Sequence, residues 1–348
     1  MRAMLVLGLP FFLVTACAAT PPPAHTHGSA PTESAPPGAL DPELVTYRYP
    51  YPVSYLDVRS QGQTLRMAYL DVAPATAPNG RVALLLHGKN FSAAYWAPTI
   101  RTLTAAGFRV IAPDQIGFGK SVKPQAYAYS FEALAENTKA LFDHLGIERA
   151  SVIGHSMGGM LATRFALMYP ASTERLVLVN PIGLEDWRKL GVPDAELDDL
   201  YRKELGASPD SLRTYMRNAY FGGAWKPEYE ALLEIHKGWM LHPGYPLVAR
   251  NAALTSQMIF TQPVVQDFPR ITVPTLLIIG QRDRTAIGKD RATKELAATL
   301  GNYPELGRRA AASIPGAKLV EIETAGHLPQ VEAFDAYARA LLAFVTPS

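Results

Sequence analysis

The chain has 348 residues, of which 48% are hydrophobic, 9% aromatic and 18% charged. Enough apolar side chains are present to fill a core, which excludes disordered and collagen-like proteins. The formal net charge of +2 gives no electrostatic reason to expect nucleic acid as a partner. A single cysteine, Cys17, excludes an internal disulfide and a cysteine-based zinc site.

The first 16 residues resemble an export signal. Arg2 precedes the apolar run Ala3–Ala16, which is too short to span a bilayer but suits the apolar region of a signal peptide. Val14-Thr15-Ala16-Cys17 resembles the lipobox of bacterial lipoproteins, in which the signal is cut before a cysteine that becomes lipid-modified. We therefore expect residues 1–16 to be removed, and Cys17 to anchor the protein to a bacterial membrane, facing the periplasm or the cell exterior. A soluble secreted protein is the alternative, because Ala16-Cys17-Ala18 also fits an ordinary A-x-A cleavage site.

Residues 17–45 have the composition of a disordered tether. Seven of the 29 prolines fall between Pro21 and Pro42, among Ala, Ser, Thr and Gly and without apolar periodicity. His25 and His27 lie in this segment. Two histidines on a flexible tether make a weak metal site, so we expect them to be solvated linker residues.

After residue 46, strands alternate with helices. The runs Tyr51–Ser60 and Gln63–Val72 flank Gln61-Gly62 and predict a hairpin. Later β-forming runs predict buried strands at Val82–Leu86, Arg109–Ala112, Ser151–Ile153, Leu176–Val179, Thr275–Ile279 and Leu319–Ile322. Helices are predicted at Ser92–Ala106, Ser130–Leu145, Met157–Tyr169 and Val331–Val345. This order predicts an α/β fold with a mostly parallel sheet and helices on both faces.

Residues 181–268 interrupt the alternation. The segment is too long for a loop without structure of its own. Ser208-Pro209-Asp210 is a good helix start, and Pro227–Met240 has a helical pattern. We predict a helical cap at residues 181–268, inserted into a core formed by residues 46–180 and 269–348.

The segment Gly154–Gly158 carries the sequence G-x-S-x-G between a predicted strand and a predicted helix. In that context the serine, Ser156, sits on a sharp and strained turn, and the glycines let neighbouring backbone pass. On this motif the chain resembles the α/β-hydrolase family, over about residues 50–345. The resemblance implies the α/β-hydrolase fold, with Ser156 as nucleophile.

In this family the nucleophile is followed along the chain by an acid and then a histidine. Asp283 and His327, each placed after a predicted strand, match those two positions. The resemblance implies that His327 takes the proton of Ser156 and that Asp283 holds the imidazole tautomer. Other candidates for the acid are Asp290, the main rival, the more remote Glu185, and Asp267 and Asp335, which also fit surface charges.

Two backbone N–H groups should form the oxyanion hole. One belongs to Met157, directly after the nucleophile, and the other to Lys89, after the strand end Leu86-His87-Gly88. We expect the Lys89 side chain to face solvent. His155 flanks the nucleophile, but its side chain should point away from Ser156, so we interpret it as a packing residue.

The segment Asp114–Ser121 contains Gly-Lys-Ser, but a Walker A loop would need glycine at position 114. The eight residues instead resemble the D-x-x-G-x-G-x-S loop of α/β-hydrolases. Dehalogenases and epoxide hydrolases resemble this fold but carry aspartate at the nucleophile position, so Ser156 argues against both.

The predicted cap is rich in aromatic residues and methionine. Most of these should pack the cap onto the sheet, but a cap over a serine site usually also walls an apolar pocket. We therefore expect a serine hydrolase that cleaves carboxylic esters of small or medium apolar substrates, with no cofactor, metal or nucleic acid. The alternatives are a C–C bond hydrolase of vinylogous diketones, a perhydrolase, and a ligand-binding homologue without turnover. The oligomeric state is not indicated.

Overall fold

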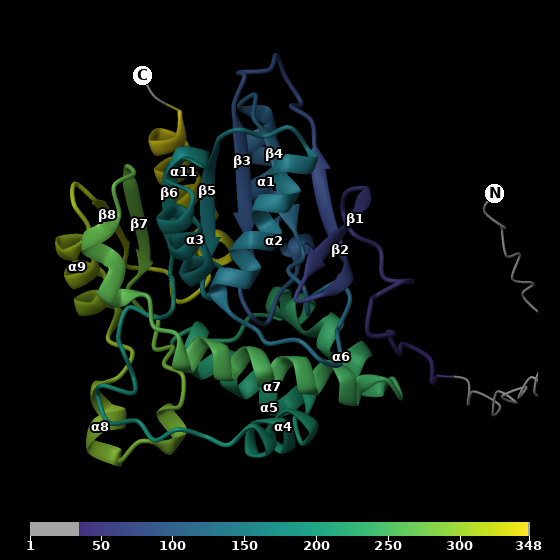
Figure 1. Cartoon of the computed structure of the whole chain (residues 1–348). Helices are drawn as coiled ribbons and strands as arrows, with labels where there is room; N and C mark the ends of the chain where they lie inside the picture. The colour runs from purple at the N-terminus through teal and green to yellow at the C-terminus, as the bar shows by residue number, and fades with distance from the viewer. Residues whose placement is uncertain (1–34, 347–348) are drawn as a thin grey trace, which may run out of the picture. The chain divides into compact units, whose positions relative to one another are not determined.

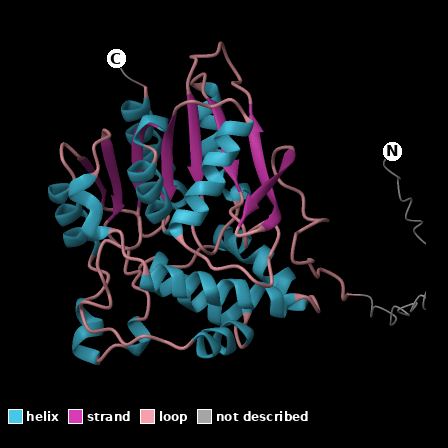
Figure 2. Ribbon diagram, viewed as in Figure 1, coloured by secondary structure: helices cyan, strands magenta, loops and turns pink. Residues whose placement is uncertain are grey.

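Eight strands form one sheet in the computed structural model, which describes residues 35–346 (Figures 1 and 2). The predicted signal peptide and Cys17 lie outside the described residues. The strands are β1 (Val53–Ser60), β2 (Gln63–Val72), β3 (Val82–Leu86), β4 (Arg109–Pro113), β5 (Ala150–His155), β6 (Thr173–Val179), β7 (Thr275–Gly280) and β8 (Lys318–Ile322).

The strands follow the order β1-β2-β4-β3-β5-β6-β7-β8. The β1–β2 hairpin and the β2–β4 pair are antiparallel, and the other pairs are parallel. Gln61 and Gly62, at the hairpin turn, both have positive φ, of 50° and 73°, as the twist of a tight hairpin favours. The predicted hairpin and mostly parallel sheet are confirmed.

Helices cover both faces of the sheet. One core holds side chains of α2 (Phe131–His144), α3 (Met157–Met168) and α9 (Tyr303–Ser313), and the other holds those of α1 (Ala97–Ala105) and α11 (Phe334–Val345). Leu84 and Leu86 of β3 belong to the first core, whereas Ala83 and Leu85 belong to the second. Because successive strand residues point to opposite faces, burial on both sides explains the continuous apolar run.

Two predicted helices differ at their starts. The predicted helix at Ser92–Ala106 opens as a 3₁₀ turn, and α1 begins only at Ala97, with Pro98 in its first turn where a missing N–H costs nothing. The predicted helix Val331–Val345 is broken at Ala333, between α10 (Pro329–Glu332) and α11. The helix predicted after Ser130 is α2, and the Ser130 side chain caps it by accepting from the Ala133 N–H.

Between β6 and β7 the chain forms four α-helices, which lie across one end of the sheet (Figures 1 and 2). Residues 181–268 are called the insertion below. Ser208 starts the second helix with a capping box to Ser211. That helix runs directly into one π-helical turn, Met216–Tyr220. The helices are α4 (Leu197–Leu205), α5 (Pro209–Tyr215), α6 (Glu234–Leu241) and α7 (Tyr245–Thr261).

The predicted tether, residues 17–45, is too long at its C-terminal end, because residues 35–45 belong to the folded unit. Leu44 is fully buried and packs with Trp239 and Val248 of the insertion. The Leu40 N–H donates to the Gly238 carbonyl at 2.9 Å, and Trp239 Nε1 donates to the Asp41 carbonyl at 3.1 Å. These contacts offset the cost of ordering this proline-rich segment. From Ala35 on, the chain is one compact unit, and residues 35–49 are called the N-terminal strap.

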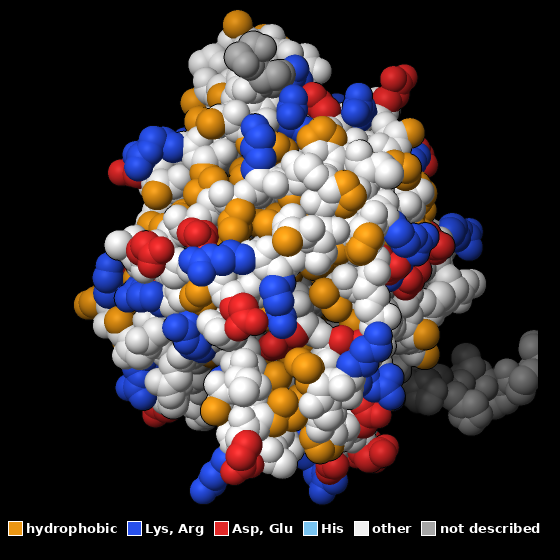
Figure 3. Space-filling model, turned by 90° about the vertical axis from the view of Figure 1, so that its left-hand side faces the viewer, with side chains coloured by type: hydrophobic (Ala, Val, Ile, Leu, Met, Phe, Trp, Pro, Cys, Tyr) orange, Lys and Arg blue, Asp and Glu red, His pale blue; other side chains and the backbone are white. Residues whose placement is uncertain are grey.

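The surface of this unit carries both signs of charge. In Figure 3, Lys and Arg side chains are interspersed with Asp and Glu over the visible face, in keeping with the formal net charge of +2. Within residues 35–346, no helix has the length and apolar character needed to cross a membrane.

Candidate active site

Ser156 lies on the turn between β5 and α3, with φ 56° and ψ −122°. Positive φ is unfavourable for serine, so the surrounding structure must hold the turn. A Cβ on Gly154 would lie 2.1 Å from the Gly158 carbonyl oxygen, and one on Gly158 would lie 2.1 Å from that of Leu86. The two glycines of the motif are therefore required for backbone approach around the serine.

The structure brings Ser156, His327 and Asp283 together in one hydrogen-bonded chain. His327 Nε2 lies 2.9 Å from Ser156 Oγ, and His327 Nδ1 lies 2.6 Å from Asp283 Oδ2. The side chains of His327 and Asp283 are fully buried. The three residues follow β5, β8 and β7, at the carboxyl ends where open α/β sheets place their sites.

Asp283 is held by two residues that the sequence reasoning missed. Asn180 Nδ2 donates to Asp283 Oδ2 at 2.9 Å, and the Thr285 N–H donates to Oδ1 at 2.8 Å. Asn180 Oδ1 in turn accepts from the Gly280 N–H at 2.8 Å. Asn180 has φ 35°, a left-handed conformation that asparagine tolerates better than most residues. Its position directly after β6 was the one signal that could have singled it out.

The rival acids are engaged elsewhere. Asp290 accepts from Lys203 Nζ at 2.5 Å on the exposed face of the protein. Glu185 accepts from the Gly301 N–H at 2.9 Å and from Trp187 Nε1 at 3.2 Å. The remaining two are Asp267, which pairs with Arg164 and Arg270, and Asp335, which is exposed.

His155 is fully buried and contacts the backbone carbonyl of His327. Burial, with a smaller effect of His327, lowers the pKa of His155 well below its ordinary value. The ring is therefore neutral: Nε2–H donates to the His327 carbonyl and Nδ1 accepts from the Tyr95 hydroxyl, both at 2.9 Å. His155 is thus a packing residue that supports the His327 backbone. The ring that hydrogen-bonds to the Ser156 hydroxyl is that of His327.

Of the two expected oxyanion donors, Met157 directly follows the nucleophile, and Lys89 follows Gly88, whose backbone passes close to it. Met157 begins α3, whose first N–H groups have no partner within the helix. A Cβ on Gly88 would lie 3.0 Å from Ser156 Cβ, so the backbone leading into Lys89 passes close to the serine. The Lys89 side chain does not face solvent: Nζ donates to Glu204 Oε1 of α4 at 2.8 Å, and the side chain is 17% exposed.

The loop Asp114–Ser121 is a structural element. Asp114 Oδ1 accepts from the Ala93 N–H at 2.6 Å, and Oδ2 accepts from the Lys120 N–H at 2.7 Å. Gly119 has φ 47°, and a Cβ there would meet the Asp114 carboxylate at 2.2 Å. The carboxylate occupies the centre of the loop, so the loop braces the segment after β3 and does not cradle a phosphate.

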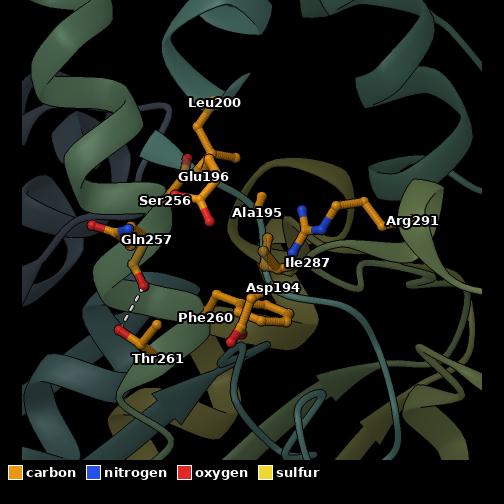
Figure 4. A pocket seen from close by; sticks show the side chains of 10 residues that line it. All are labelled: Asp194, Ala195, Glu196, Leu200, Ser256, Gln257, Phe260, Thr261, Ile287 and Arg291. Atoms are coloured by element: carbon orange, nitrogen blue, oxygen red, sulfur yellow. Dashed lines mark hydrogen bonds between the residues drawn. The ribbon is translucent and has the colours of Figure 1, made fainter. Parts of the chain in front are cut away.

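A separate cavity of about 190 Å³ lies between the insertion and the loop after β7 (Figure 4). Side chains of α7, including Phe260, face Arg291 across it, and the Arg291 guanidinium lies 4.7 Å from the Phe260 ring centroid. None of Ser156, Asp283 and His327 lines this cavity. In the part of the chain that the structure describes, no three His, Cys, Asp or Glu side chains gather in a way that could hold a metal ion.

A mostly parallel sheet with a serine on its strand–helix turn, and a histidine and an aspartate after later strands, defines an α/β hydrolase. The profile of the alpha/beta hydrolase family matches residues 83–340, and the chain belongs to that family.

Proteins similar to this chain include hydrolytic enzymes. The chain is 55% identical to a probable hydrolytic enzyme from Pseudomonas aeruginosa PAO1, with a TM-score of 0.86 over 89% of this chain and 99% of that one. It is 29% identical to a 2-hydroxy-6-oxononadienedioate/2-hydroxy-6-oxononatrienedioate hydrolase from Comamonas testosteroni, over 77% of this chain and 89% of that protein. It is 36% identical to a haloalkane dehalogenase from Mycolicibacterium paratuberculosis, over 38% of this chain and 44% of that protein.

Proposed function

We propose that the protein is a serine hydrolase that cleaves a carboxylic ester of a small or medium apolar substrate through an acyl-enzyme. The observation that carries the proposal is the hydrogen-bonded chain from Ser156 Oγ through the His327 imidazole to Asp283, with contacts of 2.9 and 2.6 Å. A serine hydroxyl is a weak nucleophile by itself, and a neighbouring base oriented by a carboxylate is the arrangement that activates it.

The reaction has two halves. In the first, Ser156 Oγ attacks the ester carbonyl while His327 Nε2 takes its proton, and the same nitrogen then gives that proton to the departing alcohol. In the second, a water molecule attacks the acyl-enzyme and loses a proton to His327, which returns it to Ser156 Oγ as the acid leaves. Asp283, which accepts from His327 Nδ1, keeps the imidazole in the tautomer that can accept at Nε2.

The negative charge that develops on the carbonyl oxygen needs donors close to Ser156. We assign this role to the backbone N–H groups of Met157 and Lys89, because Met157 directly follows Ser156 and Lys89 follows Gly88, whose backbone lies close to Ser156. Aromatic side chains close around the same point, among them Phe91 and Tyr220, and they support an apolar substrate.

One alternative reaction has support of its own. The Comamonas testosteroni hydrolase matches over most of both chains, which favours C–C bond hydrolysis of a vinylogous diketone as the second candidate. Dehalogenation is disfavoured despite the matching haloalkane dehalogenase, because Ser156 stands where that chemistry uses aspartate. A perhydrolase and a ligand-binding homologue without turnover use the same three residues and are separated by experiment.

The test is covalent labelling with a fluorophosphonate, which reacts with an activated serine. We expect the wild type to be labelled on Ser156, Ser156→Ala to stay unlabelled, and Ser151→Ala to be labelled like the wild type. Ser151 is a matched control, because it is a fully buried serine on β5 whose hydroxyl has no partner within the described residues. An unlabelled wild type, or equal labelling of Ser156→Ala, would overturn the proposal.

The substrate class is tested on the same preparations. A chain-length series of chromogenic esters should be hydrolysed by the wild type, with the highest kcat/KM at short or medium acyl chains. A vinylogous diketone measured beside it decides between ester and C–C hydrolysis. A higher kcat/KM for the diketone would replace the ester assignment with the second candidate.

A further inference from the structure

The π-helical turn Met216–Tyr220 of the insertion sits directly on the two loops that carry Asp283 and His327. The Ala219 carbonyl accepts from the Arg284 N–H at 3.0 Å, and the Tyr220 carbonyl accepts from the His327 N–H at 2.7 Å. Isolated π turns within helices are frequently found at functional sites.

The turn is packed too tightly to be an incidental neighbour. A Cβ on Gly326 would lie 1.9 Å from the Tyr220 carbonyl oxygen, so the residue before His327 must be glycine for this contact to exist. The backbone of the insertion therefore contacts the backbone of Gly326 and His327 directly, and a shift of the insertion would move His327.

The Tyr220 side chain contacts both His327 and Asn90, which follows Lys89. Its ring stacks on the His327 imidazole, with centroids 4.3 Å apart and planes 26° from parallel. Its hydroxyl accepts from Asn90 Nδ2 at 2.8 Å, and Asn90 is the neighbour of Lys89. The side chain is almost fully buried, and burial raises the pKa of Tyr220 well above its ordinary value, so the hydroxyl stays neutral.

We propose that Tyr220 is a positioning residue for the hydrolytic reaction. Its ring and carbonyl fix His327, and its hydroxyl fixes, through Asn90, the loop whose Lys89 N–H serves the oxyanion. The insertion thereby sets the distance between the base and the oxyanion site, and not only the shape of the substrate pocket. The inference rests on the proposed function, because it assigns Tyr220 a part in that same reaction.

Positioning of this kind changes kcat more than KM. An oxyanion donor stabilises the transition state, in which charge has developed, more than the bound substrate. A donor moved by a fraction of an ångström therefore slows the chemical step while substrate binding changes little. If Tyr220 only filled space among Phe91 and Tyr215, phenylalanine would replace it without loss, because the ring would remain.

The experiment is a double-mutant cycle on the hydroxyl contact. We expect Tyr220→Phe and Asn90→Ala each to lower kcat about 5-fold with KM within about twofold, the loss typical of one hydrogen bond. Because both changes remove the same contact, the double variant should also lose about 5-fold, and not the roughly 25-fold of independent effects. Tyr220→Leu, which also removes the stacked ring, should lose more than Tyr220→Phe.

The control is Tyr229→Phe. Tyr229 is a buried tyrosine of the same insertion, and its ring stacks on Phe221 with centroids 4.0 Å apart. Because it lies outside the proposed machinery, the kcat of Tyr229→Phe should stay within about twofold of wild type. Wild-type kcat in Tyr220→Phe, or losses that multiply in the double variant, overturns the positioning role even when fluorophosphonate labels Ser156. A wild type that neither reacts with fluorophosphonate nor turns over an ester or a diketone overturns both proposals together.

Discussion

The side chains that meet at Ser156 are held by contacts at the ends of two neighbouring strands, β5 and β6. Asp283 is fixed by Asn180 after β6, and the His327 backbone is fixed by His155 at the end of β5. Ser156 is fixed by its own turn, at φ 56°. Because these residues lie at the ends of packed strands, the geometry exists before a substrate arrives, and its entropy cost is met during folding.

The choice of acid can be tested at the residue scale. In Asp283→Asn the amide N–H would face His327 Nδ1 and hold the tautomer with a proton on Nε2, which cannot accept from Ser156. We expect kcat to fall roughly 10⁴-fold, as the equivalent change does in other triads, with the fold intact by circular dichroism. Asp290→Asn is the control and should retain kcat within about twofold, because that side chain contacts Lys203 on the surface. The reverse ranking would make Asp290 the acid.

Residues with a signal in the neighbouring sequence could be predicted, and residues that act across the fold could not. Ser156, Asp283 and His327 each follow a strand in a recognisable local pattern, and the structure brings them together as expected. The contact of Asn180 with Asp283 depends on the pairing of β6 with β7. The contact of Tyr220 with His327 depends on how the insertion packs against the sheet domain, and no short stretch of sequence predicts it.

At the scale of elements, apolar periodicity predicted the strands well and missed several helices. The helix α7 was not predicted, because Asn251 and Thr255 lie on its buried side and interrupt the apolar pattern. Both are satisfied by hydrogen bonds: Asn251 Oδ1 accepts from the Tyr129 hydroxyl, and Thr255 Oγ1 donates to the Asn251 carbonyl at 2.9 Å. The helices α8 (Lys294–Thr299) and α9 were missed as well.

The N-terminal strap and the loop around Asp114 form one hydrogen-bonded unit. The Tyr49 hydroxyl donates to Asp114 Oδ2 at 2.7 Å, and Lys120 Nζ donates to the Leu44 carbonyl. Lys123 Nζ donates to the Ser121 carbonyl at 2.9 Å and lies 5.4 Å from the Trp239 ring centroid. The sequence predicts a spacer here, because the composition is that of a linker and the contacts that order the strap are long-range.

This unit predicts a dependence of stability on pH. Burial lowers the pKa of Lys123 to about 7, although Asp114 acts in the opposite direction. The same lysine has a pKa of about 10.4 in an unfolded chain, so between pH 7 and 10 the unfolded state binds a proton that the folded state lacks. Stability therefore rises with pH in that window, and it levels off below pH 7, where both states are protonated.

The comparison is with Lys123→Met, which cannot take up that proton. We expect the free energy of unfolding of the wild type, relative to Lys123→Met, to rise by a few kcal/mol at most from pH 7 to pH 10. Urea unfolding at each pH measures it. A difference between the two proteins that is flat across the window would contradict a depressed pKa at Lys123.

At the scale of the whole molecule, the folded unit begins at Ala35, and the strap enters beside the insertion. The contact of Leu40 with Gly238 of α6 places that entry on the side of the molecule that carries the active-site insertion.

The lipid anchor at Cys17 remains a prediction, and fractionation of cells that export the protein tests it. We expect Cys17→Ser to move the protein from the membrane to the soluble fraction, because the predicted acyl chains supply the membrane affinity. Its specific activity should stay unchanged, since the site is built wholly from residues after 85. Ser29→Ala, a change within the same predicted tether, should leave the protein in the membrane fraction. Membrane association of Cys17→Ser equal to that of the wild type would exclude the anchor, whereas a wild type already soluble would favour the ordinary signal peptide.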